Sequence, residues 1–306
     1  MKEKKTANAV RTNHYRCIAA IVLCSVISFL VFLAVSDQLL SKPDALVQEV
    51  GWKSYHMFTI LSNMFMGVAA AMCIPYAADG LRYNNYHLPR WTVNVLFTGA
   101  TGVALTFLIA VTVLSPMTSY YRMMLYSNNI LFHTTIPILS IVLFIVVNSD
   151  HKVSMKATLI AITPLVLYAL LYLVLVFIIG EENGGWRDHY QIKQITEHVP
   201  LPLVFVGMIL IAYAVALVLR AAHNKVHQKR KAEVESYYQF DDMYAYPDIE
   251  SAIKALAQVN RQRDKGGELI VPRRIMAMME NKYQSQLPVE EMCKLYIDAY
   301  YEGGSK

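Results

Sequence analysis

Two short polar segments interrupt apolar stretches of the sequence, and each contains a residue that could take part in covalent catalysis. Residues 55–63 read YHMFTILSN, and residues 128–137 read NNILFHTTIP. A threonine hydroxyl is a weak nucleophile at neutral pH and needs a base within about 2.6–3.2 Å, for which an imidazole is the usual choice. Thr59 and His133 are therefore the candidate nucleophile and the candidate general base.

Helical spacing places the polar residues of each segment on one face. The first face comprises His56, Thr59, Ser62, Asn63 and Met66, and the second comprises Asn129, His133, Pro137 and Ser140. We expect both faces to contact other helices, because lipid disfavours polar groups. An oxyanion would need hydrogen-bond donors, and Asn63 is the first candidate, with Asn129 the second.

Each of these residues also has a purely structural interpretation. A threonine in a membrane helix commonly donates a hydrogen bond to the carbonyl one turn back, here that of Tyr55. A histidine in such a helix can serve an interhelical hydrogen bond. A catalytic role therefore depends on the elements that would bring the two residues together.

Those elements are predicted to be membrane-spanning helices. Hydrophobic residues make up 55% of the 306 and charged residues 17%, where an average soluble domain has about 25% charged residues. Mean hydropathy is +0.33. About 20 apolar residues cross a bilayer as a helix. Six stretches without Lys, Arg, Asp or Glu are long enough, between residues 16 and 37, 53 and 79, 90 and 122, 122 and 150, 156 and 181, and 197 and 220.

The predicted fold is all-α, a polytopic membrane protein with six transmembrane helices and a small helical cytosolic tail. We divide it into a basic cytosolic N-terminus (1–16), a six-helix membrane domain (17–221) and the tail (222–306). Lys and Arg precede the first span and follow the sixth, which predicts that both termini are cytoplasmic. The first apolar run, from Cys17 to Val35, exceeds the 7–15 residues typical of a signal peptide, so we interpret it as a span.

The net charge and the cysteine spacing limit the kinds of partner and metal site that we expect. The net charge of +5 is concentrated at the membrane boundaries, so it concerns orientation and no nucleic-acid partner is expected. The four cysteines show no C-x-x-C spacing, which indicates neither a disulfide framework nor a cysteine-bound metal. In the tail, one helix is predicted to begin at Asp248, another to cover residues 273–283, and a third to begin at Pro288 and end before Gly303.

The predicted spans place Thr59 and His133 at one level. With the N-terminus inside, the second and fourth spans both run from outside to inside, and each residue lies roughly five positions past the outer end of its span. At about 1.5 Å per residue, both lie roughly 6–8 Å below the outer edge of the hydrocarbon. A bundle of parallel neighbours could therefore bring the hydroxyl and the imidazole together.

At these residues the sequence resembles the androgen-induced family of integral-membrane hydrolases. Residues 55–63 resemble the family's F-T-containing segment at the start of the second span. Residues 129–137 resemble its N-x-x-x-H-T-T-x-x-P segment, although the proline here falls one residue early. A weaker third match is Gly184-Gly-Trp186 followed by Glu197-His198, and the aromatic-proline pair usual after that element is replaced by residues 187–190 (RDHY).

The resemblance implies a threonine hydrolase that acts on lipid esters, notably fatty acid esters of hydroxy fatty acids, without a cofactor. It implies that Thr59 is the nucleophile and His133 the base. The sequence resembles the bacterial members of the family more than the animal enzymes, so the expected location is a bacterial cell membrane. Asp188 and Glu197 lie in the loop on the same side and are candidates to orient His133. The apolar bundle would hold the acyl chain of a membrane lipid.

Two other interpretations stay open at this point. The first is a metal-dependent membrane hydrolase, because His56, His133, His189 and His198 are all expected toward the outer side, near Asp188 and Glu197. The second is a transporter or scaffold without enzymatic activity. No span has an Asp, Glu, Lys or Arg at its middle, which argues against proton-coupled transport.

Overall fold

A computed structural model describes residues 2–41, 51–82, 88–147, 151–237, 247–264, 276, 279 and 287–302. In this part of the chain all regular secondary structure is helical, which confirms the all-α prediction. The chain divides into two compact units. The larger one comprises Ala20–Ile74 and Leu88–Gln228, and the smaller one comprises Met1–Ala19, Pro75–His87 and Lys229–Lys306.

Five helical segments are long and apolar enough to cross a membrane, so the protein is by composition an integral membrane protein. They are Tyr15–Leu40, Phe58–Leu81, Arg90–Met117, Met155–Ile179 and Leu201–Lys229. Their principal helices are α1 (Lys2–Leu40), α2 (Phe58–Ala71) with α3 (Ile74–Arg82), α4 (Arg90–Ile109) with α5 (Ser115–Met117), α7 (Met155–Ala161) with α8 (Thr163–Tyr172), and α10 (Leu201–Tyr237). These five segments coincide with five of the six predicted spans.

The remaining predicted span, between residues 122 and 150, forms a shorter apolar helix, Leu131–Val147. It consists of a π-helical turn (Leu131–Thr135), α6 (Ile136–Val142) and a second π-helical turn (Leu143–Val147). Two asparagine side chains hold the residues just before this helix in a turn. Asn129 donates to the carbonyl of Arg122 at 2.9 Å, and Asn128 donates to the carbonyl of Ala34 at 3.3 Å. These amides stabilise a turn where a longer helix was expected.

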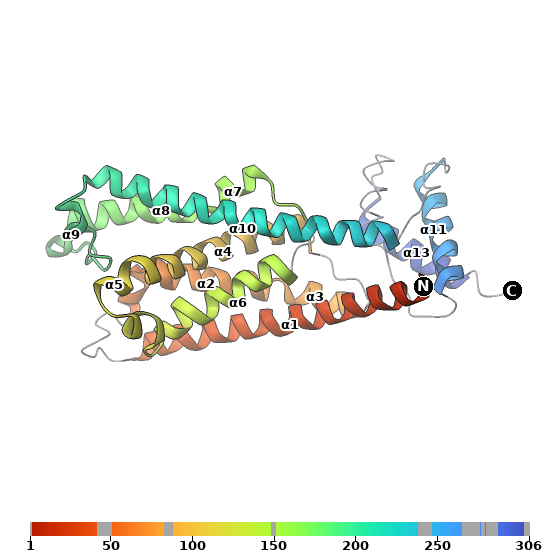
Figure 1. Cartoon of the computed structure of the whole chain (residues 1–306), viewed down its shortest axis with the longest axis horizontal. Helices are drawn as coiled ribbons and strands as arrows, with labels where there is room; N and C mark the ends of the chain where they lie inside the picture. Colours follow the sequence, from red (N-terminus) through yellow and green to blue (C-terminus); the bar gives the residue numbers. More distant parts are fainter. Residues whose placement is uncertain are drawn as a thin grey trace. The chain divides into compact units, whose positions relative to one another are not determined.

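Within the larger unit, successive segments run in opposite directions along one axis, with α2, α4 and α6 packed together (Figure 1). Small residues bring the backbones close. Ser28 of α1 donates to the carbonyl of Gly67 at 2.9 Å, and a Cβ built on Gly67 would lie 2.9 Å from Val31. Packing of this kind is typical of helices in lipid, where apolar side chains gain little by leaving the hydrocarbon.

Proline residues lie near the interruptions of two apolar helical segments, Leu131–Val147 and Met155–Ile179. Pro137 stands in the first turn of α6 and Pro164 in the first turn of α8. A proline has no N–H and clashes with the carbonyl four residues earlier, which for Pro137 is that of His133. The π-helical turn of residues 131–135 precedes Pro137 directly, and such turns are frequent at functional sites.

The smaller unit contains the tail helices α11 (Ile249–Asp264) and α13 (Val289–Glu302), which confirms two of the three predicted there. Asp248 caps α11 by accepting hydrogen bonds from the amide and hydroxyl of Ser251, both at 2.8 Å, and these bonds lower the pKa of Asp248. The predicted helix at 273–283 lies outside the described residues except Met276 and Met279, which are buried against both helices. The predicted boundary at residue 222 falls inside α10.

The close contact at Gly67 generates a stability prediction. Gly67→Leu should lower the melting temperature of the full-length protein in detergent, because overpacking a tight contact costs about 1–3 kcal/mol. Gly207→Leu on α10 is the matched control, since a Cβ there meets no atom within 4 Å. Equal melting temperatures for the two variants would contradict this account of the α1–α2 contact.

Candidate functional site

The first predicted polar face lies at the start of α2. Residues 51–56 form a 3-10 turn, and α2 begins at Phe58, with Thr59, Ser62, Asn63 and Met66 all buried. This part of the predicted face is confirmed. His56 belongs to the preceding turn rather than to α2, and its ring stacks on Trp186 with centroids 4.7 Å apart.

His133 is buried in the π-helical turn before Pro137, with 7% of its surface exposed. Its ring lies beside the backbone of Thr106 in α4. Its Nδ1 atom is buried and has no hydrogen-bond partner. In a neutral imidazole one nitrogen donates and the other accepts. In the tautomer with its proton on Nε2, the ring has a free acceptor at Nδ1, which is what a general base requires.

The side chain of Asn63 connects the two predicted segments. Its Nδ2 atom donates to the carbonyl of Thr59 at 2.7 Å and to the carbonyl of Phe132 at 3.3 Å. Phe132 directly precedes His133, so one buried amide joins the helical turn of Thr59 to the turn of His133. Both amide hydrogens are thereby used, whereas Oδ1 of Asn63 is buried without a partner. Asn63 is thus a bridge, and it has no spare donor for an oxyanion.

The hydroxyl of Thr59 is paired with a residue that the sequence did not indicate. The amide of Phe58 donates to the phenol oxygen of Tyr190 at 2.8 Å, and the hydroxyl and backbone of Thr59 lie beside the same oxygen. Tyr190 therefore satisfies a main-chain donor at the start of α2, which has no carbonyl partner within the helix. In this arrangement the hydroxyl of Thr59 lies next to the phenol of Tyr190.

Burial raises the pKa of Tyr190 above its ordinary value, and the polar groups of Thr59 and Phe58 beside its oxygen offset only part of that effect. The phenol is consequently neutral at physiological pH, because its ordinary pKa is already about 10. A neutral phenol can hold the Thr59 hydroxyl and donate a proton in a hydrogen bond, but it cannot serve as a base.

The loop between residues 180 and 200 covers this end of the larger unit and delivers Tyr190. Gly180 and Gly184 have φ angles of +80° and +86°, and the amide of Trp186 donates to the carbonyl of Leu175 at 3.0 Å. A Cβ on Gly185 would lie 2.0 Å from that same carbonyl oxygen. The Gly-Gly-Trp element is therefore a tight turn that places Trp186 against His56. Glycine fits there because of the positive φ angle of Gly184 and the close approach of a carbonyl oxygen to Gly185.

The acidic residues proposed to orient His133 have other roles. Asp188 accepts hydrogen bonds from the hydroxyl of Tyr172 and from the amides of Ile192 and Lys193, so it caps the short helix α9 (Ile192–Thr196). Glu197 is exposed just after α9. The ring of His133 lies beside the backbone of Thr106. Asn129, proposed as a second oxyanion donor, is engaged by the carbonyl of Arg122.

The histidines considered as metal ligands do not converge. Among the described residues, no group of three His, Cys, Asp or Glu side chains lies close enough to hold a metal ion. His56 and His189 are neighbours, with ring centroids 6.4 Å apart, but His56 is stacked on an indole. All four cysteines fall within the described residues, and they are buried and form no disulfide.

An apolar cavity of about 200 Å³ lies beside the site, between α2, α4, the α7–α8 segment and α10. Phe58, Leu61, Ser62 and Phe65 supply the wall on α2, and Tyr168 supplies part of the opposite wall. Thr59 is on the adjacent face of α2, and Tyr168 contacts the hydroxyl of Tyr190. Tyr168 therefore borders both the cavity and the surroundings of Tyr190.

Comparisons with protein-family models, curated proteins and solved structures find no match to this chain. The function must therefore be argued from the chemistry of the site and from the short motifs of the sequence. Of the predicted residues, the structure brings Thr59, Asn63 and the His133 turn together and leaves Asn129, Asp188 and Glu197 with other partners.

The role found for Tyr190 yields a test by substitution. Tyr190→Phe should lower the melting temperature by about 2–4 °C for each kcal/mol lost, because the amide of Phe58 loses its hydrogen-bond acceptor, at a cost of about 1–3 kcal/mol. Tyr121→Phe is the control, since Tyr121 is 65% exposed. If both variants have the melting temperature of the wild type, the Tyr190 hydroxyl does not stabilise the start of α2.

Proposed function

We propose that this protein is a membrane-embedded lipid ester hydrolase in which Thr59 is the nucleophile and His133 the general base. The observation that carries the proposal is the Asn63 amide, which holds the carbonyls of Thr59 and Phe132 together. The free Nδ1 of His133 supports it as well. The resemblance of residues 55–63 and 129–137 to the androgen-induced family of hydrolases points to the same pair.

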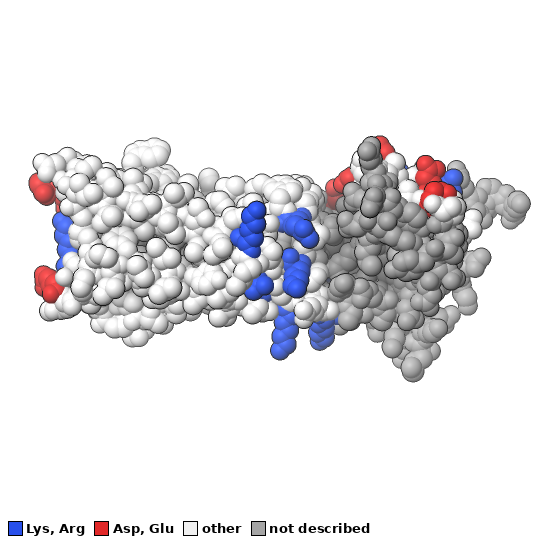
Figure 2. Space-filling model, turned by 90° about the horizontal axis from the view of Figure 1, so that it is seen from above, with Lys and Arg blue, Asp and Glu red and all other residues white. Residues whose placement is uncertain are grey.

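The topology that suits this function has six crossings, with Leu131–Val147 as the fourth. At about 1.5 Å per residue this helix is about 26 Å long, and a short span is accommodated by local thinning of the bilayer. Both termini would be cytoplasmic, in what we propose is a bacterial cell membrane. Figure 2 supports this orientation, because Lys and Arg gather toward one end of the larger unit and uncharged surface separates them from the other end.

The reaction begins when the Thr59 hydroxyl turns from Tyr190 toward Nδ1 of His133. As the Thr59 oxygen forms a bond to the ester carbonyl carbon, its proton passes to His133. The bond from this carbon to the leaving alkoxide then breaks, and His133 returns the proton to the alkoxide as the alcohol leaves. Water attacks the acyl-threonine with His133 as base, and the carboxylic acid leaves while the Thr59 hydroxyl is restored.

Stabilisation of the oxyanion falls to Tyr190 in this mechanism. Asn63 uses both of its amide hydrogens and Asn129 donates to the carbonyl of Arg122, whereas the phenol of Tyr190 is neutral and lies next to the attacking oxygen. Once Thr59 turns toward His133, the phenol proton can be donated to the developing charge. A donor aimed at an oxyanion commonly contributes about 10²–10³ in rate.

The apolar cavity beside α2 is the proposed site for an acyl chain of the substrate. Its lining is mostly hydrocarbon and aromatic, and each methylene moved from water into such a site contributes about 0.8 kcal/mol. Fatty acid esters of hydroxy fatty acids, or esters of similar length, have the long chain that this cavity and the surrounding lipid would accept.

Hydrolysis of p-nitrophenyl acyl esters by the purified full-length protein tests the assignment. Thr59→Ala and His133→Ala should each lower kcat by at least about 10², and Thr59→Ser should keep part of the activity because it keeps a hydroxyl. Thr158→Ala is the matched control, since Thr158 is a buried threonine of α7 that does not line the cavity, and Ser62→Ala tests the neighbouring hydroxyl of α2.

The melting temperature of each variant separates loss of chemistry from loss of folding. Wild-type rates in both Thr59→Ala and His133→Ala would overturn the proposed pair. A loss seen only in Ser62→Ala would move the nucleophile to the cavity. No activity in any form of the protein would leave the transporter or scaffold interpretation as the better one.

A further inference from the structure

A second cavity lies at the opposite end of the larger unit from Tyr190. Its volume is about 380 Å³, and it is lined by Arg90, Asn94, Lys152, Ser154, Met155 and Arg220. These residues come from the start of α4, from the segment that leads into α7, and from α10. We propose that this basic pocket binds the phosphate group of an anionic membrane lipid.

The walls of the pocket are held in place by buried hydrogen bonds. Asn224 of α10 accepts from the amide of Val153 at 2.8 Å and donates to its carbonyl at 3.0 Å. The two ring nitrogens of His223 contact the carbonyls of Phe144 and His151 at 2.9 and 2.8 Å. The segment that carries Lys152 and Ser154 is thereby fixed against α10, so the pocket has a defined shape.

Three cations point to an anion as the ligand. Nε of Arg220 donates to the carbonyl of Val153 at 3.1 Å, which anchors the guanidinium and leaves its terminal nitrogens for a ligand. Within the described part of the chain, no carboxylate is paired with Arg90, Lys152 or Arg220. Like charges held around one concave surface attract a multivalent anion, and a guanidinium matches the oxygens of a phosphate.

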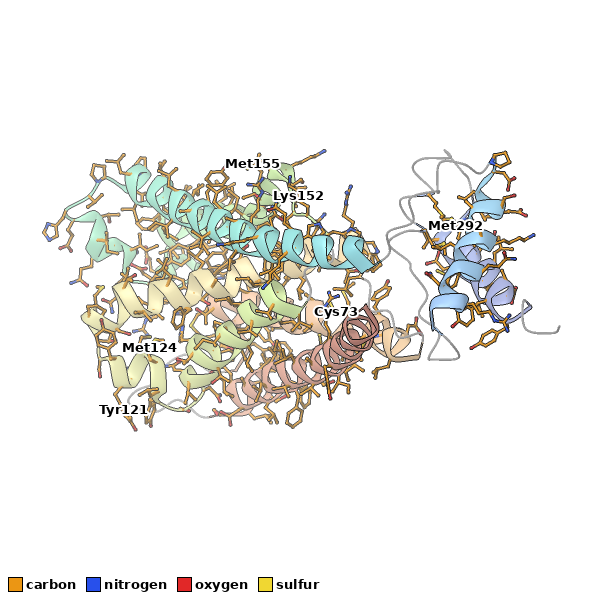
Figure 3. All side chains as sticks on the ribbon, turned by 45° about the vertical axis from the view of Figure 1, so that its right-hand side comes forward. Cys73, Tyr121, Met124, Lys152, Met155 and Met292 are labelled. Carbon is orange, nitrogen blue, oxygen red and sulfur yellow. The ribbon has the colours of Figure 1, made fainter. Side chains whose placement is uncertain are left out.

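The surroundings favour a phosphate carried by a lipid. Met155 forms part of the rim, and Figure 3 shows it beside Lys152 at the edge of the larger unit. The next outward-facing residues of α7, Leu159 and Ile160, are 55% and 54% exposed. Trp91, next to Arg90, is 49% exposed, as is typical of tryptophan at a membrane boundary. A headgroup in the pocket would thus have its acyl chains along apolar protein surface.

Free phosphate has the same chemistry as a lipid headgroup, so the experiment has separate arms for the two. The full-length protein in neutral detergent is titrated with phosphatidic acid, with phosphatidylcholine and with inorganic phosphate, and bound lipid is counted by native mass spectrometry. The variants are Arg90→Gln and Lys152→Gln, since neither side chain carries a hydrogen bond that fixes the fold. Lys156→Gln removes the same charge from an exposed position outside the pocket and is the control.

We expect one saturable phosphatidic acid per protein, bound at least tenfold more weakly in Arg90→Gln and Lys152→Gln and almost unchanged in Lys156→Gln. Inorganic phosphate should compete only at much higher concentration. Three results would overturn the proposal: equal losses in all three variants, which indicate diffuse attraction to basic residues; no preference for phosphatidic acid over phosphatidylcholine; or competition by inorganic phosphate at the same concentration as lipid, which indicates a soluble ligand.

Discussion

Hydrocarbon offers no hydrogen-bond partner to a main-chain amide or carbonyl, and the candidate site lies where α2 begins and where the apolar helix Leu131–Val147 has a π-helical turn. At the start of α2 the amide of Phe58 is satisfied by the phenol of Tyr190. At the π-helical turn before Pro137 the carbonyl of Phe132 is satisfied by the amide of Asn63. Asn63 thereby joins the turn of Thr59 to the turn of His133, so the need to satisfy the backbone contributes directly to the site.

In the loop between residues 180 and 200, side chains also satisfy main-chain polar groups. Asp188 caps α9 and accepts from Tyr172, while Tyr168 donates to the carbonyl of His56 at 2.7 Å. Tyrosines of the Met155–Ile179 segment therefore hold both the loop that carries Tyr190 and the turn that precedes α2. At the other end of the larger unit, Asn224 and His223 fix the segment before α7 in a comparable way. Side-chain hydrogen bonds at both ends of the larger unit thus hold the membrane helices together.

The sequence predicts those features that depend on local pattern. Hydropathy locates five of the membrane segments, helical periodicity identifies the buried face of Thr59, Ser62 and Asn63, and Asp248 with Pro288 marks the starts of α11 and α13. Each of these results needs only residues within one or two turns of one another, where the physical rule is simple.

The features that were not predicted depend on distant contacts. Tyr190 is 132 positions from Phe58, and the replacement of an aromatic-proline pair by residues 187–190 was the only hint that this loop is unusual. The apolar helix Leu131–Val147 is shorter than the span predicted there, and Asn128 and Asn129, just before it, donate to carbonyls outside it. Asp188 was expected near His133, but the amides of α9 lie closer along the chain and occupy both of its oxygens.

The most direct test of the central claim is the position of a covalent adduct. The full-length protein would be treated with a long-chain alkyl fluorophosphonate, digested, and mapped by tandem mass spectrometry. Our account predicts a single modification on the Thr59 oxygen that disappears in His133→Gln. An adduct on Ser62, or modification of Thr59 that is unaffected by His133→Gln, would contradict it.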